Sequence, residues 1–168
     1  MQLGEFNDLT DADAETLLQQ CCNASRWVQM MSDARPYTSI DQLLNEATAR
    51  WNRMESPDWL EAFDGHPKIG DPGSLKKKYQ ATHGLASSEQ SAVQSASDET
   101  LDALAAANAS YADKFGFIFI ICATGKSAQE MLQSISKRLG NQRQQELEIA
   151  AAEQLKITHI RLSNLIHP

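Results

Sequence analysis

The run Phe117-Ile118-Phe119-Ile120-Ile121-Cys122-Ala123 decides the fold class, because it is the one stretch of this chain that has the composition of a buried strand. Seven consecutive apolar residues suit either a short buried strand or a buried turn of helix. The chain has no second run of this kind, and a strand without a partner cannot form a sheet. We therefore expect residues 117–123 to be a helical or irregular core segment in an all-α fold.

Elsewhere, apolar residues recur at helical spacing, and helix-start signals separate the helices that we expect. Thr10 or Asp11 begins a helix to about Cys22, Ser25 begins a second, and Ser39 opens a third with capping-box spacing. Further starts are expected at Pro57, Ser87–Ser88, Asp98 and Ser127, followed by a long helical pattern that reaches Leu165. These signals predict a single compact domain, 1–168, of about seven or eight helices.

Charge and composition narrow the possible partners. The chain has 168 residues, with 15 Lys and Arg against 22 Asp and Glu, which gives a net charge of −7. Nucleic acids and anionic membranes both require a basic face, so neither is expected as a partner. No apolar run approaches the roughly 20 residues of a membrane span, and neither end carries a secretory or peroxisomal signal. We expect a cytoplasmic protein.

Cysteine and histidine spacing predicts no metal site. Cys21, Cys22 and Cys122 form an odd set without CxxC spacing, which favours reduced thiols, and Cys122 is expected to be a small apolar core residue. The histidines at 66, 83, 159 and 167 show neither an HxH nor an HExxH pattern.

The turn Gly65-His66-Pro67 carries the clearest candidate for acid–base chemistry. Gly65 can adopt backbone angles that other residues avoid, and Pro67 restricts both its own φ and the conformation of His66. Histidine exchanges protons near neutral pH, so a rigid turn that carries it indicates a catalytic position. A capping turn, in which the ring only bonds a nearby carbonyl, explains the turn alone equally well.

Two other positions have both a structural and a functional interpretation. Ser87-Ser88-Glu89-Gln90 is ordinary helix-start chemistry, but Glu89 could also fix the tautomer of an imidazole, and Gln90 offers a donor and an acceptor. Arg161 lies in an apolar stripe of the last helix. It either grips an anionic substrate or forms an ion pair with an acid such as Glu153.

Gly125-Lys126-Ser127 resembles the end of a phosphate-binding loop, but the pattern is incomplete. That motif needs a glycine five residues before Gly125, where this chain has Ile120, and it needs a βαβ context. Nucleotide binding is therefore not expected, and Lys126 is better explained as a residue beside a helix cap.

Four segments together resemble the OHCU decarboxylase family of urate catabolism. They are His-Pro-Lys-Ile-Gly at 66–70, Ser-Glu-Gln at 88–90, Phe-Ile-Ile-Cys-Ala-Thr-Gly-Lys-Ser at 119–127 and Glu-Gln-Leu-Lys-Ile-Thr-His-Ile-Arg-Leu at 153–162. The resemblance covers essentially the whole chain. It implies an all-α homodimer without metal or organic cofactor that converts 2-oxo-4-hydroxy-4-carboxy-5-ureidoimidazoline (OHCU) to (S)-allantoin.

The resemblance also assigns site residues. The family's catalytic histidine falls on His66, and its glutamate, which would orient that ring, falls on Glu89. The implied substrate contacts are Pro67, Ser87, Ser88, Gln90, Phe119, Ile121, Cys122, Ala123 and Arg161. Related sequences often have a hydroxyl residue where this chain has Ala86, so Ser87 or Ser88 would have to replace it.

The expected reaction explains why the family needs no cofactor. A ring C=N next to the carbon that loses its carboxylate can accept the electron pair, so the protein has only to orient groups and transfer protons. We expect His66 to handle proton transfer at the hydroxyl-bearing carbon. The alternatives are a non-catalytic helical binding module that uses residues 119–123, and a decarboxylase of a related ureido compound.

Overall fold

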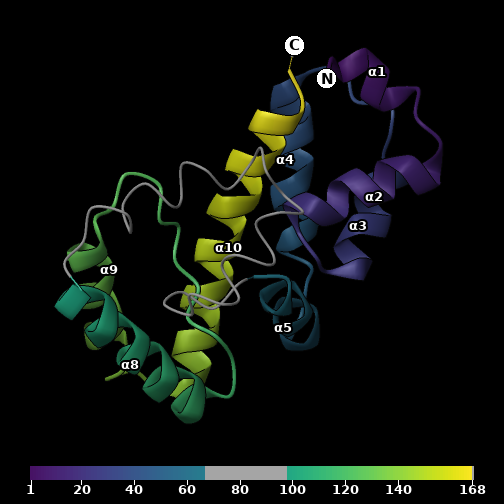
Figure 1. The fold of residues 1–168 in the computed structure, drawn as a ribbon. Helices are drawn as coiled ribbons and strands as arrows, with labels where there is room; N and C mark the ends of the chain where they lie inside the picture. Colours follow the sequence, from purple (N-terminus) through teal and green to yellow (C-terminus); the bar gives the residue numbers. More distant parts are fainter. Residues whose placement is uncertain (67–97, 168) are drawn as a thin grey trace. The chain divides into compact units, whose positions relative to one another are not determined.

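The computed structural model of the protein describes residues 1–66 and 98–167, and these residues form eight helices and no strand. The helices are α1 (Leu3–Asn7), α2 (Asp11–Cys21), α3 (Ser25–Ser32), α4 (Ile40–Trp51), α5 (Ser56–Asp64), α8 (Asp98–Phe115), α9 (Ala128–Arg138) and α10 (Arg143–Leu165) (Figure 1). The all-α prediction is confirmed for this part of the chain. Among the described helices, none combines the length and the apolarity that a membrane crossing requires. The helix start expected at Ser87–Ser88 lies outside the described residues.

The chain divides into two compact units, and it passes between them twice: after Gly65, and within α10 after Ala151. The first unit comprises Met1–Gly65 and Ala152–Pro168, and the second comprises His66–Ala151. Both units contain fully buried apolar side chains, such as Phe6 and Trp27 in the first unit and Leu104 and Ile135 in the second.

In the first unit, the helix starts expected at Thr10 and Ser39 are confirmed by side-chain caps, and α3 begins at Ser25 as expected. The Thr10 hydroxyl accepts a hydrogen bond from the Asp13 backbone N–H at 3.2 Å and begins α2. The Ser39 hydroxyl accepts from the Gln42 N–H at 3.1 Å and begins α4. Each bond satisfies an N–H that has no partner within its helix, a contribution of about 1 kcal/mol.

Helix α3 packs against α2, α4 and α5. Its residues Trp27, Val28 and Met31 are buried, as their spacing predicts. The indole N–H of Trp27 donates to the Ala47 carbonyl at 3.1 Å, so this large side chain enters the core without an unsatisfied polar atom.

The short helix α1 was not expected from the sequence. Five residues are too few for a helix that is stable alone, so tertiary contacts must hold it. The Leu3 N–H donates to the His167 carbonyl and the His167 N–H donates to the Met1 carbonyl, each at 2.9 Å. Phe6 is fully buried and stacks on Tyr37 with ring centroids 6.4 Å apart.

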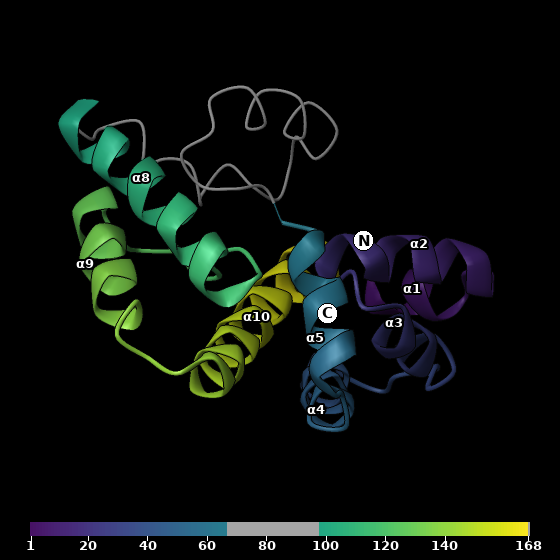
Figure 2. The ribbon, with the colours of Figure 1, turned by 90° about the horizontal axis from the view of Figure 1, so that it is seen from below.

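In the second unit, α8 and α9 lie side by side, as both ribbon views show (Figure 2). Helix α8 ends before Gly116, whose φ of +76° favours a residue without a Cβ. The helix start expected at Ser127 is confirmed by a capping box: Ser127 N–H donates to the Glu130 carboxylate at 2.7 Å, and Glu130 N–H donates to the Ser127 hydroxyl at 3.2 Å. The Glu130 carboxylate also accepts a hydrogen bond from the Ser127 hydroxyl at 2.8 Å, and the two bonds that it accepts from Ser127 hold the pKa of Glu130 below its usual value.

The structure predicts a pH dependence of stability in the first unit. His159 on α10 shares a 2.9 Å hydrogen bond between its Nε2 and the Thr48 hydroxyl of α4, and burial lowers the pKa of His159. The folded state therefore favours the neutral ring. Below the ordinary histidine pKa of about 6.5, the unfolded chain binds a proton more readily than the folded chain, so this contribution is present at neutral pH and is lost as the pH falls.

We expect His159→Gln to make the melting temperature less sensitive to pH. Glutamine keeps a hydrogen-bonding group near Thr48 but does not titrate. Thermal unfolding between about pH 7.5 and 5.5 should show a shallower decline for the variant than for the unchanged protein. Parallel curves would contradict the assignment.

Candidate functional site

Residues 117–123 connect α8 to the turn before α9, and they are irregular and largely buried. The sequence prediction of a helical or irregular core segment is thus confirmed in its irregular form. Phe119, Ile121, Cys122 and Ala123, the four candidate substrate contacts in this segment, are 3%, 6%, 7% and 9% exposed. The structure brings these four together in one buried stretch of the second unit.

Backbone carbonyls of this segment accept hydrogen bonds from groups outside it. An irregular buried segment has no ladder of backbone partners, so its polar groups must find donors elsewhere. The Lys126 N–H donates to the Ala123 carbonyl at 2.9 Å, and its ammonium donates to the Cys122 carbonyl at 2.8 Å. Lys126 therefore supports the turn at Gly125, where φ is +76°, in agreement with its expected role beside a cap.

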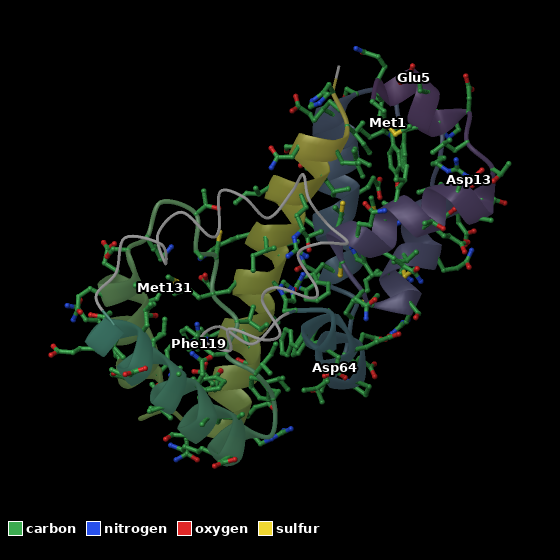
Figure 3. All side chains as sticks on the ribbon, in the orientation of Figure 1. Met1, Glu5, Asp13, Asp64, Phe119 and Met131 are labelled. Atoms are coloured by element: carbon green, nitrogen blue, oxygen red, sulfur yellow. The ribbon has the colours of Figure 1, made fainter. Side chains whose placement is uncertain are left out.

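Arg138, the last residue of α9, holds the Ile120 carbonyl. The Nη1 of Arg138 donates to that carbonyl at 2.8 Å, and the guanidinium of Arg138 lies 4.5 Å from the centre of the Phe119 ring. Phe119 lies close to α8 (Figure 3), where its ring and that of Tyr111 form a T-shaped pair with their centroids 5.2 Å apart. One arginine thus contacts two successive residues of the segment.

Arg138 belongs to a buried polar cluster that the sequence analysis did not identify. Its Nε and Nη2 lie 2.6 and 2.5 Å from Oε1 of Glu146, a residue with no exposed surface. Tyr111 also donates to Oε1, and Asn141 donates to Oε2 at 2.8 Å. Burial, with the Glu146 hydrogen bond, raises the pKa of Tyr111 well above its usual value, so this hydroxyl remains a donor.

A sequence signal for this cluster exists. Met131, Ile135 and Arg138 are spaced as one face of a helix, and the first two are buried, so Arg138 is a charged residue within an apolar stripe. Such a residue needs a buried partner, but the sequence alone does not show that Glu146 on the next helix supplies it.

His66 follows α5, which is anchored to the first turn of α3. The Glu61 carboxylate accepts hydrogen bonds from both the N–H, at 3.1 Å, and the hydroxyl of Ser25. Asn23 donates its side-chain amide to the Glu61 carbonyl at 3.3 Å. These bonds tie α5 to the start of α3, and half-buried His66 comes two residues after Asp64, the last residue of α5.

The reason for glycine at position 65 differs from the one expected. Gly65 has φ −72° and ψ −11°, which any residue can adopt, so its backbone angles do not require glycine. A Cβ at this position would lie 2.7 Å from the Cβ of Asn23. Glycine is needed because α5 approaches the α2–α3 connection this closely.

Arg161 is half-buried on α10 in the first unit, near the α2–α3 connection. Burial raises the pKa of both Cys21 and Cys22 to about 12, and the positive charge of Arg161 opposes this rise at both thiols. Glu153, an ion-pair partner suggested by the sequence, contacts Lys156 at 2.5 Å.

Several candidate residues are not placed by the structure. Pro67, Ser87, Ser88, Glu89 and Gln90 lie outside the described residues. His66 and Arg161 belong to different units, so their approach to each other stays a prediction. Within residues 1–66 and 98–167, no group of three or more His, Cys, Asp or Glu side chains is arranged to hold a metal ion.

Comparison with known proteins identifies the class. The family model described as OHCU decarboxylase matches residues 7–163. A crystal structure of an OHCU decarboxylase in the presence of (S)-allantoin superposes with a TM-score of 0.77 and 38% identity, covering 94% of this chain and 98% of that one. A structure of (S)-allantoin synthase, at 18% identity and a TM-score of 0.73, shares the fold.

Curated relatives agree with this class. The chain is 39% identical over 145 residues to the uric acid degradation bifunctional protein TTL of Arabidopsis thaliana, covering 86% of this chain but 45% of that protein. It therefore spans less than half the length of this bifunctional relative. A decarboxylase of Halalkalicoccus jeotgali, 28% identical, is covered over 91% of its length.

The fold and these matches define a member of an all-α decarboxylase family. More particularly, the chain belongs to the OHCU decarboxylase family.

The contact at Gly65 predicts that Gly65→Ala destabilises the protein. The new Cβ would meet the Cβ of Asn23, which is attached to backbone and cannot swing away, so we expect a loss of about 1–3 kcal/mol in the free energy of unfolding. Urea unfolding would measure it. The double variant Asn23→Gly/Gly65→Ala removes the clash and should recover part of the loss. A single variant within about 0.5 kcal/mol of the unchanged protein would contradict this account.

Proposed function

We propose that this protein decarboxylates OHCU to (S)-allantoin. The observation that carries the proposal is the similarity, over nearly the full length of both chains, to an OHCU decarboxylase solved in the presence of (S)-allantoin. Family membership over residues 7–163 supports the same reaction. Both described units would then belong to one catalytic domain, 1–168, since the match includes residues of each.

The proposed reaction needs no electron sink from the protein. When the carbon–carboxylate bond breaks, CO₂ leaves, and its electron pair moves into the bond between the two ring carbons while the ring C=N nitrogen accepts the charge. That nitrogen takes up a proton. The resulting enol then loses its hydroxyl proton and gains a proton at the neighbouring ring carbon, which gives allantoin with a net uptake of one proton. The protein therefore has to orient the substrate and to accept and donate protons.

In this proposal, His66 accepts the proton of the hydroxyl group on the carbon that loses its carboxylate, and Glu89 orients the His66 ring and stabilises its charged form. Half-burial of His66 is compatible with contact to a substrate. Pro67, Ser87, Ser88 and Gln90 would contact the ring and its ureido oxygens.

The described residues Phe119–Ala123 and Arg161 would complete the site. Residues 119–123 form a dry apolar wall with backbone groups fixed by Lys126 and Arg138, which favours the departure of a charged carboxylate as neutral CO₂. Arg161 would bind substrate oxygens with its guanidinium fork.

We further propose a cytoplasmic homodimer that uses no metal or organic cofactor. The substrate's own electron sink makes a cofactor unnecessary. All three cysteines of the chain are free thiols, which suits a reducing compartment. The small-molecule substrate would be its ligand, with neither nucleic acid nor membrane as a partner, as the net charge of −7 suggests.

The direct test uses OHCU generated in the cuvette by uricase and hydroxyisourate hydrolase. The purified chain should accelerate the formation of optically pure (S)-allantoin, followed by circular dichroism. Allantoin that forms at the spontaneous rate and as a racemate would contradict the proposal and favour a non-catalytic binding module. Activity with another ureido acid, and not with OHCU, would indicate a related decarboxylase.

We expect His66→Ala to reduce turnover by at least about 100-fold, the usual contribution of a general acid–base residue, while the protein keeps its melting temperature. His167→Ala is the matched control, because His167 is exposed and its backbone makes the bonds that hold α1. Activity of His66→Ala within a few-fold of the unchanged protein would remove His66 from the mechanism.

We expect Arg161→Ala chiefly to raise KM, by about 10- to 100-fold, if the guanidinium binds substrate and transition state alike. Arg26→Ala removes an arginine whose ion pair with Asp58 lies at the surface of the same unit, and it should leave KM unchanged. Initial rates over a range of OHCU concentrations separate KM from kcat. Unchanged values of both for Arg161→Ala would exclude Arg161 from the site.

A further inference from the structure

Arg138 contacts two successive residues of the 119–123 segment. It is 7% exposed, its Nη1 donates to the Ile120 carbonyl at 2.8 Å, and its guanidinium lies 4.5 Å from the Phe119 ring centre. Together these contacts fix a peptide group and a neighbouring side chain in the part of the segment that lies between the candidate substrate contacts Phe119 and Ile121.

Arg138 is itself held in one orientation. Nε and Nη2 both lie within 2.6 Å of Oε1 of Glu146, so the same guanidinium plane that pairs with the carboxylate also aims Nη1 at the Ile120 carbonyl. Tyr111 and Asn141 donate to the carboxylate from α8 and from the turn after α9. The carboxylate therefore cannot shift without breaking several hydrogen bonds.

We propose that Arg138 is a positioning residue for decarboxylation: it holds the Ile120 peptide and the Phe119 ring so that the 119–123 segment meets the substrate in one fixed geometry. The inference rests on the proposed function. Arg138 contacts protein groups and not the reacting atoms, so it acts through the segment. Displacement of such groups by about 1 Å is enough to slow an enzyme by about 100-fold.

Arg138→Lys separates this role from simple charge neutralisation. A lysine ammonium still pairs with Glu146, so the buried carboxylate keeps a counter-ion. Its single nitrogen lacks the planar fork that reaches Glu146 and Ile120 together. If Arg138 only neutralised Glu146, lysine would preserve activity; if it positions the segment, lysine would not.

The test compares steady-state kinetics with OHCU at 25 °C, well below the melting temperature of each variant. We expect Arg138→Lys to lower kcat/KM by at least ten-fold, with most of the loss in kcat. Hydrogen–deuterium exchange of peptides that span residues 117–123 should be faster than in the unchanged protein. A purely structural arginine would lower the melting temperature and leave kcat at 25 °C unchanged.

Arg143→Lys is the matched control. Like Arg138, Arg143 donates to a backbone carbonyl and lies over an aromatic ring: its Nε donates to the Phe115 carbonyl at 2.9 Å, and its guanidinium lies 5.8 Å from the Phe117 ring centre. It therefore makes the same kind of contact just before residue 119. We expect its kcat and KM to stay within two-fold of the unchanged protein.

A second variant covers the case in which Arg138→Lys does not fold. The triple variant Tyr111→Phe/Arg138→Met/Glu146→Leu replaces the cluster by apolar residues of similar volume, a change that often preserves stability. It also removes the donor to Ile120, so the same ten-fold loss is expected. A folded variant, single or triple, whose kcat lies within two-fold of the unchanged protein would overturn the positioning role. If the unchanged protein does not act on OHCU, the proposed function fails first, and the positioning role with it.

Discussion

The structure of the second unit depends on the satisfaction of buried backbone carbonyls in a segment that is neither helix nor strand. Residues 117–123 are apolar enough to enter the core, but they bring polar peptide groups with them. Arg138 and Lys126 solve this problem from the end of α9 and from the turn before it. Because these donors are charged, the bonds are stronger than neutral ones and fix the segment more firmly.

The donor from α9 carries an electrostatic cost of its own. A buried arginine loses its hydration, which costs free energy. The ion pair with Glu146 offsets this cost only because the Glu146 carboxylate also accepts hydrogen bonds from Tyr111 and Asn141. Apolar side chains in place of this cluster would need no buried hydrogen-bond partners, so stability alone does not explain the cluster. What the cluster adds is a donor that holds the Ile120 carbonyl in one direction, and apolar side chains cannot donate this hydrogen bond.

Sequence reasoning succeeds here where the cause is local. Thr10, Ser39 and Ser127 cap the helices that their spacing predicts, because each cap bonds a backbone group within three residues. It fails to predict α1, because the hydrogen bonds that hold this helix come from the far end of the chain. It also fails to explain why position 65 needs glycine, because the reason is the close approach of Asn23. The sequence pattern alone assigns His66 to a turn and Arg161 to the last helix. It does not show that Arg138 and Glu146 form a pair, because these two residues meet only through tertiary packing.

The proposed reaction explains why firm backbone placement would matter. A substrate that accepts its own electron pair leaves the protein with orientation as its main contribution, and orientation is lost when the surrounding groups move. A helix or strand would hold such groups by its own hydrogen-bond ladder. The irregular 119–123 segment has no ladder of that kind, so its rigidity has to come from side chains such as that of Arg138. In this family member, a buried ion pair between α9 and α10 would thus take the place of regular secondary structure at the site.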